Sequence, residues 1–166
     1  HLPAPVFVMT NEHQAGLAVE HLGAKMQVLL VDESRGRTAM LEQALVDAGY
    51  DVVAHVEMSN HLHIQVEECQ PDVIVVDIEA PDSEDLTSLQ VVSRENPKPI
   101  VMFTNKRGAG TIEKAINAGI SAYVVDGLNP DRIKPVVEVA VARFNEIYAL
   151  RQELADTKKQ LSERKL

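Results

Sequence analysis

The chain has 166 residues, of which 45% are hydrophobic, and a formal net charge of −9. This composition excludes a disordered chain and provides enough apolar sequence for one folded domain with an appendage. The acidic balance argues against binding of this chain to the phosphate backbone of a nucleic acid and suits a site for metal cations. Cys69 is the only cysteine, which excludes an internal disulfide, and no apolar run approaches the ~18 residues of a membrane span.

Residues 1–25 precede the first apolar run, and the chain begins with His1. We interpret Met26 as the native start and residues 1–25 as an N-terminal extension or a segment of non-native origin. The alternative is a genuine N-terminal element, because Leu17 and His21 are spaced four apart and fit one short amphipathic helix over residues 12–22.

From residue 26 onward, short apolar runs alternate with helical patterns. The runs are rich in Val and Ile and lie at residues 27–31, 51–56, 72–77, 99–103 and 122–125. Such runs are typical of strands buried on both faces of a parallel sheet. The segments between them place apolar residues three and four apart; Ile112, Ala115 and Ile116 mark the fourth helix, which Gly119 closes. Five βα units in this order predict an α/β fold, a flavodoxin-like doubly wound (βα)5 parallel sheet.

The fifth helical segment opens with Asn129 and Pro130, a favourable pair for a helix start, and contains no glycine up to residue 166. At ~1.5 Å per residue this helix is too long for the domain that it leaves. The residues that recur every seven positions are Ile133, Ala140, Ile147, Leu154 and Leu161, with Arg143 and Thr157 interrupting the companion positions. The pattern predicts a coiled coil, and a single helix fraying past residue 150 is the alternative. We assign residues 26–145 to the domain and residues 146–166 to a coiled-coil linker helix that pairs two copies of the chain.

Three acids follow strands of the predicted sheet. Asp32 and Glu33 come after the first strand, and Asp77 ends the third. Because the carboxyl ends of parallel strands share one edge of a sheet, these carboxylates are expected to lie together and to bind Mg²⁺. A carboxylate beside such an ion can act as a nucleophile toward phosphorus and form an aspartyl phosphate. Thr104 follows the fourth strand, so its hydroxyl is expected at the same edge, within reach of a phosphoryl oxygen. The alternative is that each acid caps a helix or ends a strand.

This set of motifs resembles the receiver domain of two-component response regulators over about residues 26–145. The resemblance rests on LLVDES with Asp32 and Glu33, PDVIVVDIEAP with Asp77, PIVMFT with Thr104, and AGISAYVVDGL with Tyr123. It implies that Asp77 is the phosphoacceptor, that Asp32, Glu33 and Asp77 hold Mg²⁺, and that Tyr123 occupies the aromatic switch position.

Asp126 departs from the receiver pattern, because a typical receiver has a lysine at this position. The lysine bridges the phosphoryl group to the rest of the site by a cation contact. An aspartate reverses that charge and repels the incoming phosphoryl group unless Mg²⁺ or Lys106 compensates. Alternatively, Asp126 only forms an Asp-Gly turn and faces solvent. Both interpretations remove the lysine, and we therefore expect that phosphorylation of Asp77 is weak or is not the physiological signal.

The motif AGISAYVVDGL followed by the long helix is similar to the NasT/AmiR group of ANTAR-type antiterminators. This resemblance implies a cytoplasmic regulator of nitrogen-related genes, in which an RNA-binding ANTAR domain follows the coiled coil and prevents transcription termination. We expect that the 166 residues stop before that domain. The resemblance also implies a partner that is a ligand-sensing regulatory protein or a histidine kinase, and no membrane association.

Two other functions remain open at this point. One is a stand-alone receiver that depends on phosphorylation of Asp77, which the intact acidic residues favour. The other is a phosphohydrolase that uses Glu79, two residues past Asp77, as general acid and base; no further catalytic motif accompanies this pair, and we expect no enzyme. His55, within the second strand, is interpreted as a packed core or edge residue.

Overall fold

The structure is a computed structural model that describes residues 25–33, 39–125 and 129–164. The short helix expected over residues 12–22 and the side chain of Asp126 both lie outside the described residues. The expectations for these two places therefore remain predictions.

Five parallel strands form one sheet in the order β2-β1-β3-β4-β5, which is the flavodoxin-like order. The strands are β1 Gln27–Asp32, β2 Asp51–Glu57, β3 Val73–Asp77, β4 Ile100–Thr104 and β5 Ala122–Val125. The helices are α3 Ala39–Asp47, α4 Leu62–Cys69, α5 Ser83–Glu95, α6 Ala109–Asn117 and α7 Pro130–Arg164. The predicted doubly wound (βα)5 fold is confirmed.

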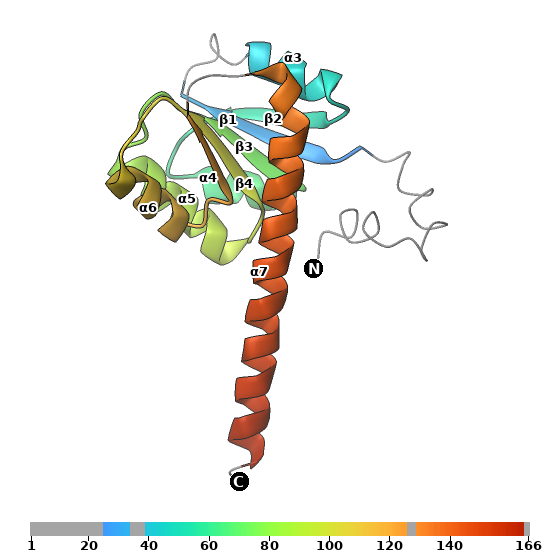
Figure 1. Ribbon diagram of the computed structural model, residues 1–166, viewed down its shortest axis with the longest axis vertical. Coiled ribbons are helices and arrows are strands. Elements are labelled where there is room, and N and C mark those ends of the chain that lie inside the picture. The colour runs from blue at the N-terminus through green and yellow to red at the C-terminus, as the bar shows by residue number, and fades with distance from the viewer. Residues whose placement is uncertain (1–24, 34–38, 126–128, 165–166) are drawn as a thin grey trace.

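Helices cover both faces of the sheet (Figure 1), as the continuous apolar runs of the strands require. On one face, residues of α4, α5 and α6 form a core cluster with alternate residues of the strands, such as Leu29 and Ile74. On the other face, α3 and the first part of α7 pack on the intervening residues, such as Leu30 and Val75. The three interior strands β1, β3 and β4 are therefore buried on both sides, and their positions are fixed by packing.

The helix boundaries follow from local chemistry. The Asn129 side chain accepts a hydrogen bond from the backbone N–H of Asp131 at 3.0 Å, which caps the start of α7 as predicted. Gly119, after α6, has a φ of +104°, a conformation that glycine adopts without strain. Helix α6 forms where it was predicted, but only Ala115 is buried; Ile112 and Ile116 lie on its exposed side.

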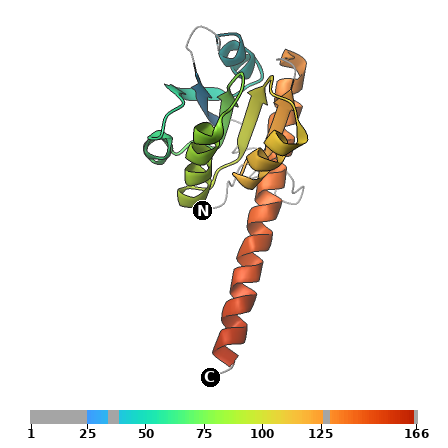
Figure 2. The same ribbon diagram turned by 90° about the vertical axis from the view of Figure 1, so that its left-hand side faces the viewer.

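Helix α7 packs on the domain through Ile133, Val137, Ala140 and Val141, and then runs on away from it. Figures 1 and 2 show from two directions that its C-terminal end projects well beyond the sheet and the other helices. The predicted boundary between residues 145 and 146 falls inside this continuous helix and stays a prediction. Within the described residues, no helix combines the length and the apolar character needed to cross a bilayer.

Candidate functional site at the carboxyl edge of the sheet

Two carboxylates lie side by side at the carboxyl edge of the sheet. Asp32 at the end of β1 pairs in register with Asp77 at the end of β3. Side chains alternate along a strand, and Leu30 and Val75, each two residues earlier, belong to the same core cluster. Both aspartates therefore lie on the face that α3 and α7 cover, and they are 1% and 9% exposed. The sequence prediction that these two acids meet at one edge is confirmed.

His55 is a residue of the site that the sequence analysis placed only in the core or at the sheet edge. Its Nε2 lies 2.9 Å from Oδ2 of Asp32, and its Nδ1 lies 3.6 Å from Oε1 of Glu42 on α3. A carboxylate only accepts hydrogen bonds, so the imidazole N–H donates to Asp32. The observation that could have placed His55 in the site is that it pairs with Leu30. Leu30 lies two residues before Asp32, so the side chains of His55 and Asp32 are on the same face of the sheet. That pairing depends on the register of β1 and β2, which shifts between Val28 and Leu29 and does not follow from the predicted fold class.

Glu79 links the loop after Asp77 to both neighbouring strands through its backbone. Its N–H donates to Oε1 of Glu33 at 2.9 Å, and its carbonyl oxygen accepts the Thr104 hydroxyl at 2.9 Å and the Asn105 N–H at 3.0 Å. Glu33 and Thr104 thus hold the loop that follows the expected phosphoacceptor. The alternation of β4 places Thr104 on the face opposite Asp77, because Met102 belongs to the core cluster under α4, α5 and α6.

Lys106 and Tyr123 extend this network toward β5. The backbone N–H of Lys106 donates to the Thr104 hydroxyl at 3.1 Å, and its Nζ donates to the carbonyl oxygen of Pro81 at 3.3 Å. The Tyr123 hydroxyl donates to the carbonyl oxygen of Lys106 at 2.6 Å. Burial raises the pKa of Tyr123, and the side-chain hydrogen bond with Thr104 opposes this shift. Thr104, Lys106 and Tyr123 therefore form one connected chain from the site to the edge strand.

A further acid, Asp85, lies at the start of α5 close to this edge. Asp82 and Asp85 form a capping box, in which each side chain accepts the backbone N–H of the other. Burial raises the pKa of Asp85 most; the negative charges of Asp82 and Glu33 add to this, whereas the hydrogen bond from the Asp82 backbone lowers it. This edge of the sheet therefore carries further acidic side chains in addition to Asp32 and Asp77.

The donor set fits a hard cation such as Mg²⁺ with water completing its coordination. Mg²⁺ sites in proteins commonly use one or two carboxylates and several waters, and Asp32 and Asp77 supply two carboxylates on neighbouring strands. Glu33, the third predicted ligand, uses one oxygen for the Glu79 N–H. Over the ranges that the structure describes, no three His, Cys, Asp or Glu side chains gather as a ready metal site. The three-residue ligand set therefore stays a prediction.

Comparison with known proteins gives one consistent result. Residues 28–138 match the family of response regulator receiver domains. The transcriptional regulatory protein PdtaR of Mycobacterium tuberculosis is 28% identical over 140 residues, which cover 84% of this chain and 68% of PdtaR. The chemotaxis protein CheY of Listeria monocytogenes is 25% identical over 69% of this chain and 98% of its own. A CheY-like receiver domain protein of Methanospirillum hungatei shares the fold, with a TM-score of 0.62 at 19% identity over 74% of this chain and 98% of that one.

Replacing Thr104 with valine tests the linkage through Glu79. Thr104 is 3% exposed, and its hydroxyl makes two hydrogen bonds that an isosteric valine cannot make. We expect Thr104→Val to lower the free energy of unfolding in urea by about 1–3 kcal/mol. The control is Thr87→Val on the exposed side of α5, where water replaces the bond to the Ser83 carbonyl and the change should stay within about 0.5 kcal/mol. Equal losses in the two variants would contradict this role of Thr104.

Proposed function

Because the chain belongs to the family of response regulator receiver domains, a family of two-component signalling, we propose that it is an atypical receiver that controls transcription antitermination. The output would be an ANTAR RNA-binding domain that the 166 residues do not contain, as in the NasT/AmiR group. The similarity to PdtaR, a protein named as a transcriptional regulator, supports a role in transcription. The observation that carries the proposal is the in-register pair Asp32 and Asp77 at the carboxyl edge of the sheet.

In this proposal Asp77 is the phosphoacceptor. A carboxylate oxygen of Asp77 forms a bond to the phosphorus of a donor, the bond from phosphorus to the donor's leaving group breaks, and an aspartyl phosphate results. Mg²⁺ held by Asp32, Asp77 and Glu33 would neutralise negative charge on the transferring phosphoryl group. Asp32 is kept in place for this by the His55 N–H. Glu33 positions the loop after Asp77 through its bond to the Glu79 N–H.

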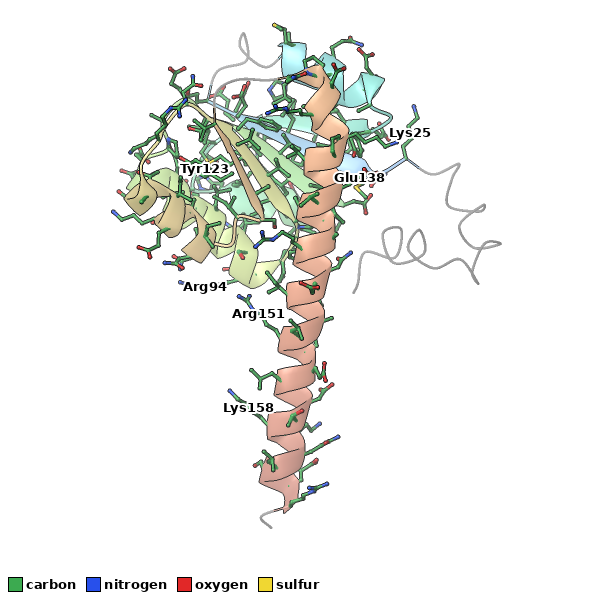
Figure 3. The ribbon with its side chains drawn as sticks, viewed as in Figure 1. Lys25, Arg94, Tyr123, Glu138, Arg151 and Lys158 are labelled. Carbon is green, nitrogen blue, oxygen red and sulfur yellow. The ribbon has the colours of Figure 1, made fainter. Side chains whose placement is uncertain are left out.

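Thr104 and Tyr123 would transmit the modification to β5. Thr104 and Asp77 lie on opposite faces of the sheet, but both end their strands at the same edge. A phosphoryl group on Asp77 would extend past that edge, where one of its oxygens would compete with the Glu79 carbonyl oxygen for the Thr104 hydroxyl. Movement of Thr104 then affects the Lys106 N–H, which donates to it, and the Tyr123 hydroxyl, which donates to the Lys106 carbonyl. Tyr123 lies on the edge strand, so the end of this chain of contacts is at the surface (Figure 3).

Asp126 would determine how readily Asp77 is phosphorylated. An aspartate where a typical receiver has a lysine replaces a positive charge with a negative one and removes the cation that would contact the phosphoryl group. Lys106 supplies a cation two residues past Thr104, but its Nζ contacts the Pro81 carbonyl. We infer that the physiological signal is contact with a partner, a ligand-sensing regulatory protein or a histidine kinase, rather than stable phosphorylation. The alternative is a stand-alone receiver that depends on phosphorylation of Asp77.

Phosphorylation by a small donor distinguishes these two modes. With Mg²⁺ and acetyl phosphate, intact-mass spectrometry should find little phosphoryl adduct on the wild-type chain, because of the charge of Asp126. Asp126→Lys should increase the adduct about tenfold or more, since one charge-assisted contact is worth ~1.4 kcal/mol or more. The double variant with Asp77→Asn should remove it.

Rapid and stable phosphorylation of the wild-type chain, lost in Asp77→Asn, would overturn the partner-driven mode in favour of the stand-alone receiver. An Asp126→Lys variant that stays as unreactive as the wild type would show that the charge at this position is not what limits the site.

We also propose that α7 pairs with α7 of a second copy in a coiled coil. The first two members of the seven-residue repeat, Ile133 and Ala140, are buried on the chain's own domain, whereas Ile147, Leu154 and Leu161 are 42%, 53% and 52% exposed. In proteins most of the stability of a helix comes from packing of its apolar face rather than from its intrinsic propensity. Pairing would cover the exposed members and give a homodimer.

A charge on this stripe should separate the copies. We expect light scattering to find a dimer for the wild-type chain and a monomer for Leu154→Asp, because an aspartate in the seam of a coiled coil is desolvated without a partner. The matched control is Ala149→Asp, an exposed position of α7 away from the stripe, which should stay dimeric. A monomeric wild-type chain at high concentration would refute the pairing.

The remaining parts of the proposal follow from the same resemblance. The protein would act in the cytoplasm on nitrogen-related genes, and contact with RNA would occur only through the ANTAR domain. Receiver domains are in general signalling domains without enzymatic activity, and we assign none to this chain. Its domains would be the receiver at residues 26–145 and the coiled-coil linker helix at residues 146–166, preceded by the segment at residues 1–25.

A further inference from the structure

A groove of about 660 Å³ lies at the end of the sheet opposite the carboxylates. Its walls are the C-terminal part of α5, the turn from α6 into β5, and the middle of α7. Pro97 and Ser121, which line it, precede β4 and β5, whereas Asp77 and Thr104 end their strands. The groove is thus separate from the proposed phosphorylation site. Its volume lies within the range of roughly 300–1,000 Å³ that is usual for small-molecule sites.

The charge of this groove is opposite to that of the chain. Arg94 from α5 and Arg143 and Arg151 from α7 line it, and none of the lining residues within the described ranges is an aspartate or a glutamate. The whole chain, in contrast, has 25 acidic and 16 basic residues. Three guanidinium groups in a concave site without a single acid create a local positive potential that attracts anions.

These arginines are not used to stabilise the fold. In the described part of the chain, none of the three makes an ion pair or a side-chain hydrogen bond, and all three are exposed. Figure 3 shows Arg94 at the end of α5 and Arg151 on α7 just beyond the domain, on the two sides of the groove. Guanidinium groups bind phosphate oxygens in a planar, bidentate geometry, so a ligand with two or more phosphates would engage both sides.

The groove also has an apolar part. Ile116 on α6 and Phe144, Ile147 and Tyr148 on α7 line it, and the Phe144 and Tyr148 rings are stacked, with centroids 5.8 Å apart and an interplanar angle of 15°. A planar heterocycle packs well on such a surface, because every base has a face that can stack on an aromatic ring. Inorganic phosphate or pyrophosphate would leave this part of the groove unfilled.

The backbone that forms the groove is held in place. At Gly119 on the groove wall, an added Cβ would lie 2.6 Å from the Ser93 Cβ of α5, so the turn after α6 approaches α5 closely. The wall on the side of the domain is therefore closely packed, and α7 forms the other wall where it leaves the domain. A ligand that contacts Arg94 and Arg151 joins the domain to the projecting part of α7.

We propose that this groove binds a nucleoside polyphosphate, with its phosphates on Arg94, Arg143 and Arg151 and its base against the apolar part that includes Phe144 and Tyr148. The ligand would fix the projecting helix relative to the domain and would act independently of the acidic site. Nothing in this proposal depends on phosphorylation of Asp77.

Isothermal titration calorimetry of the 166-residue chain with GTP and with ATP tests the proposal. EDTA is present, so that divalent ions do not connect the nucleotide to the acidic site. We expect both nucleotides to bind, Arg94→Ala and Arg151→Ala each to weaken binding about tenfold, and Asp77→Asn to leave it unchanged. The matched control is Arg164→Ala, which removes the same charge from an exposed position of α7 outside the groove and should change affinity less than twofold.

Four results would overturn the proposal. The first is that neither nucleotide binds, and the second is an equal loss in Arg151→Ala and Arg164→Ala, which would mean unspecific attraction to basic residues. The third is inorganic pyrophosphate binding as tightly as GTP, which would exclude a role for the base. The fourth is nucleotide binding only in the Leu154→Asp variant, which would mean that a second copy of the chain covers the groove.

Discussion

The structure depends on the register between β1 and β3, which places Asp32 beside Asp77. Two buried carboxylates in adjacent positions repel each other, and such a pair persists only when protons, cations or hydrogen-bond donors compensate it. The apolar side chains of β1 and β3 are completely buried on both faces of the sheet, and their packing offsets the electrostatic repulsion between the two carboxylates. The His55 N–H compensates Asp32 in part, and the arrangement is suited to a cation that enters from solvent. The same packing that stabilises the sheet therefore creates the acidic site.

The other contacts of the site concern the loop after Asp77 rather than the aspartates themselves. Glu33 and Thr104, from two different strands, both bind the backbone of Glu79, and Thr104 is linked through Lys106 to Tyr123. A change of charge at Asp77 would alter this loop first. A fold with this connection can report an event at Asp77 to β5, whether the event is transfer of a phosphoryl group or the docking of a partner.

Much of the fold and part of the site could be predicted from the sequence, because the signals were local. The Val-rich runs indicated strands, Asn129 and Pro130 marked the start of α7, and the acids after the first and third strands indicated the shared edge. The contact between His55 and Asp32 could not be predicted, because it depends on the register of β1 and β2, which shifts between Val28 and Leu29. The linkage through Glu79 uses backbone atoms, which carry no signal in the sequence. The groove under α7 was missed because Arg94 is 49 residues from Arg143 in the chain and only tertiary packing brings them together.

The measurement that tests the account most directly is the effect of Mg²⁺ on thermal stability, compared between the wild-type chain and Asp32→Asn. If Asp32 and Asp77 form a cation site, Mg²⁺ should raise the Tm of the wild type in a saturable way, by about 2–4 °C for each kcal/mol of binding free energy. Asp32→Asn should be more stable than the wild type without Mg²⁺, because one of two like charges is gone, and should gain little from the ion. Equal effects of Mg²⁺ on the two proteins, or no effect on the wild type, would contradict the claim that this pair of carboxylates is a cation site.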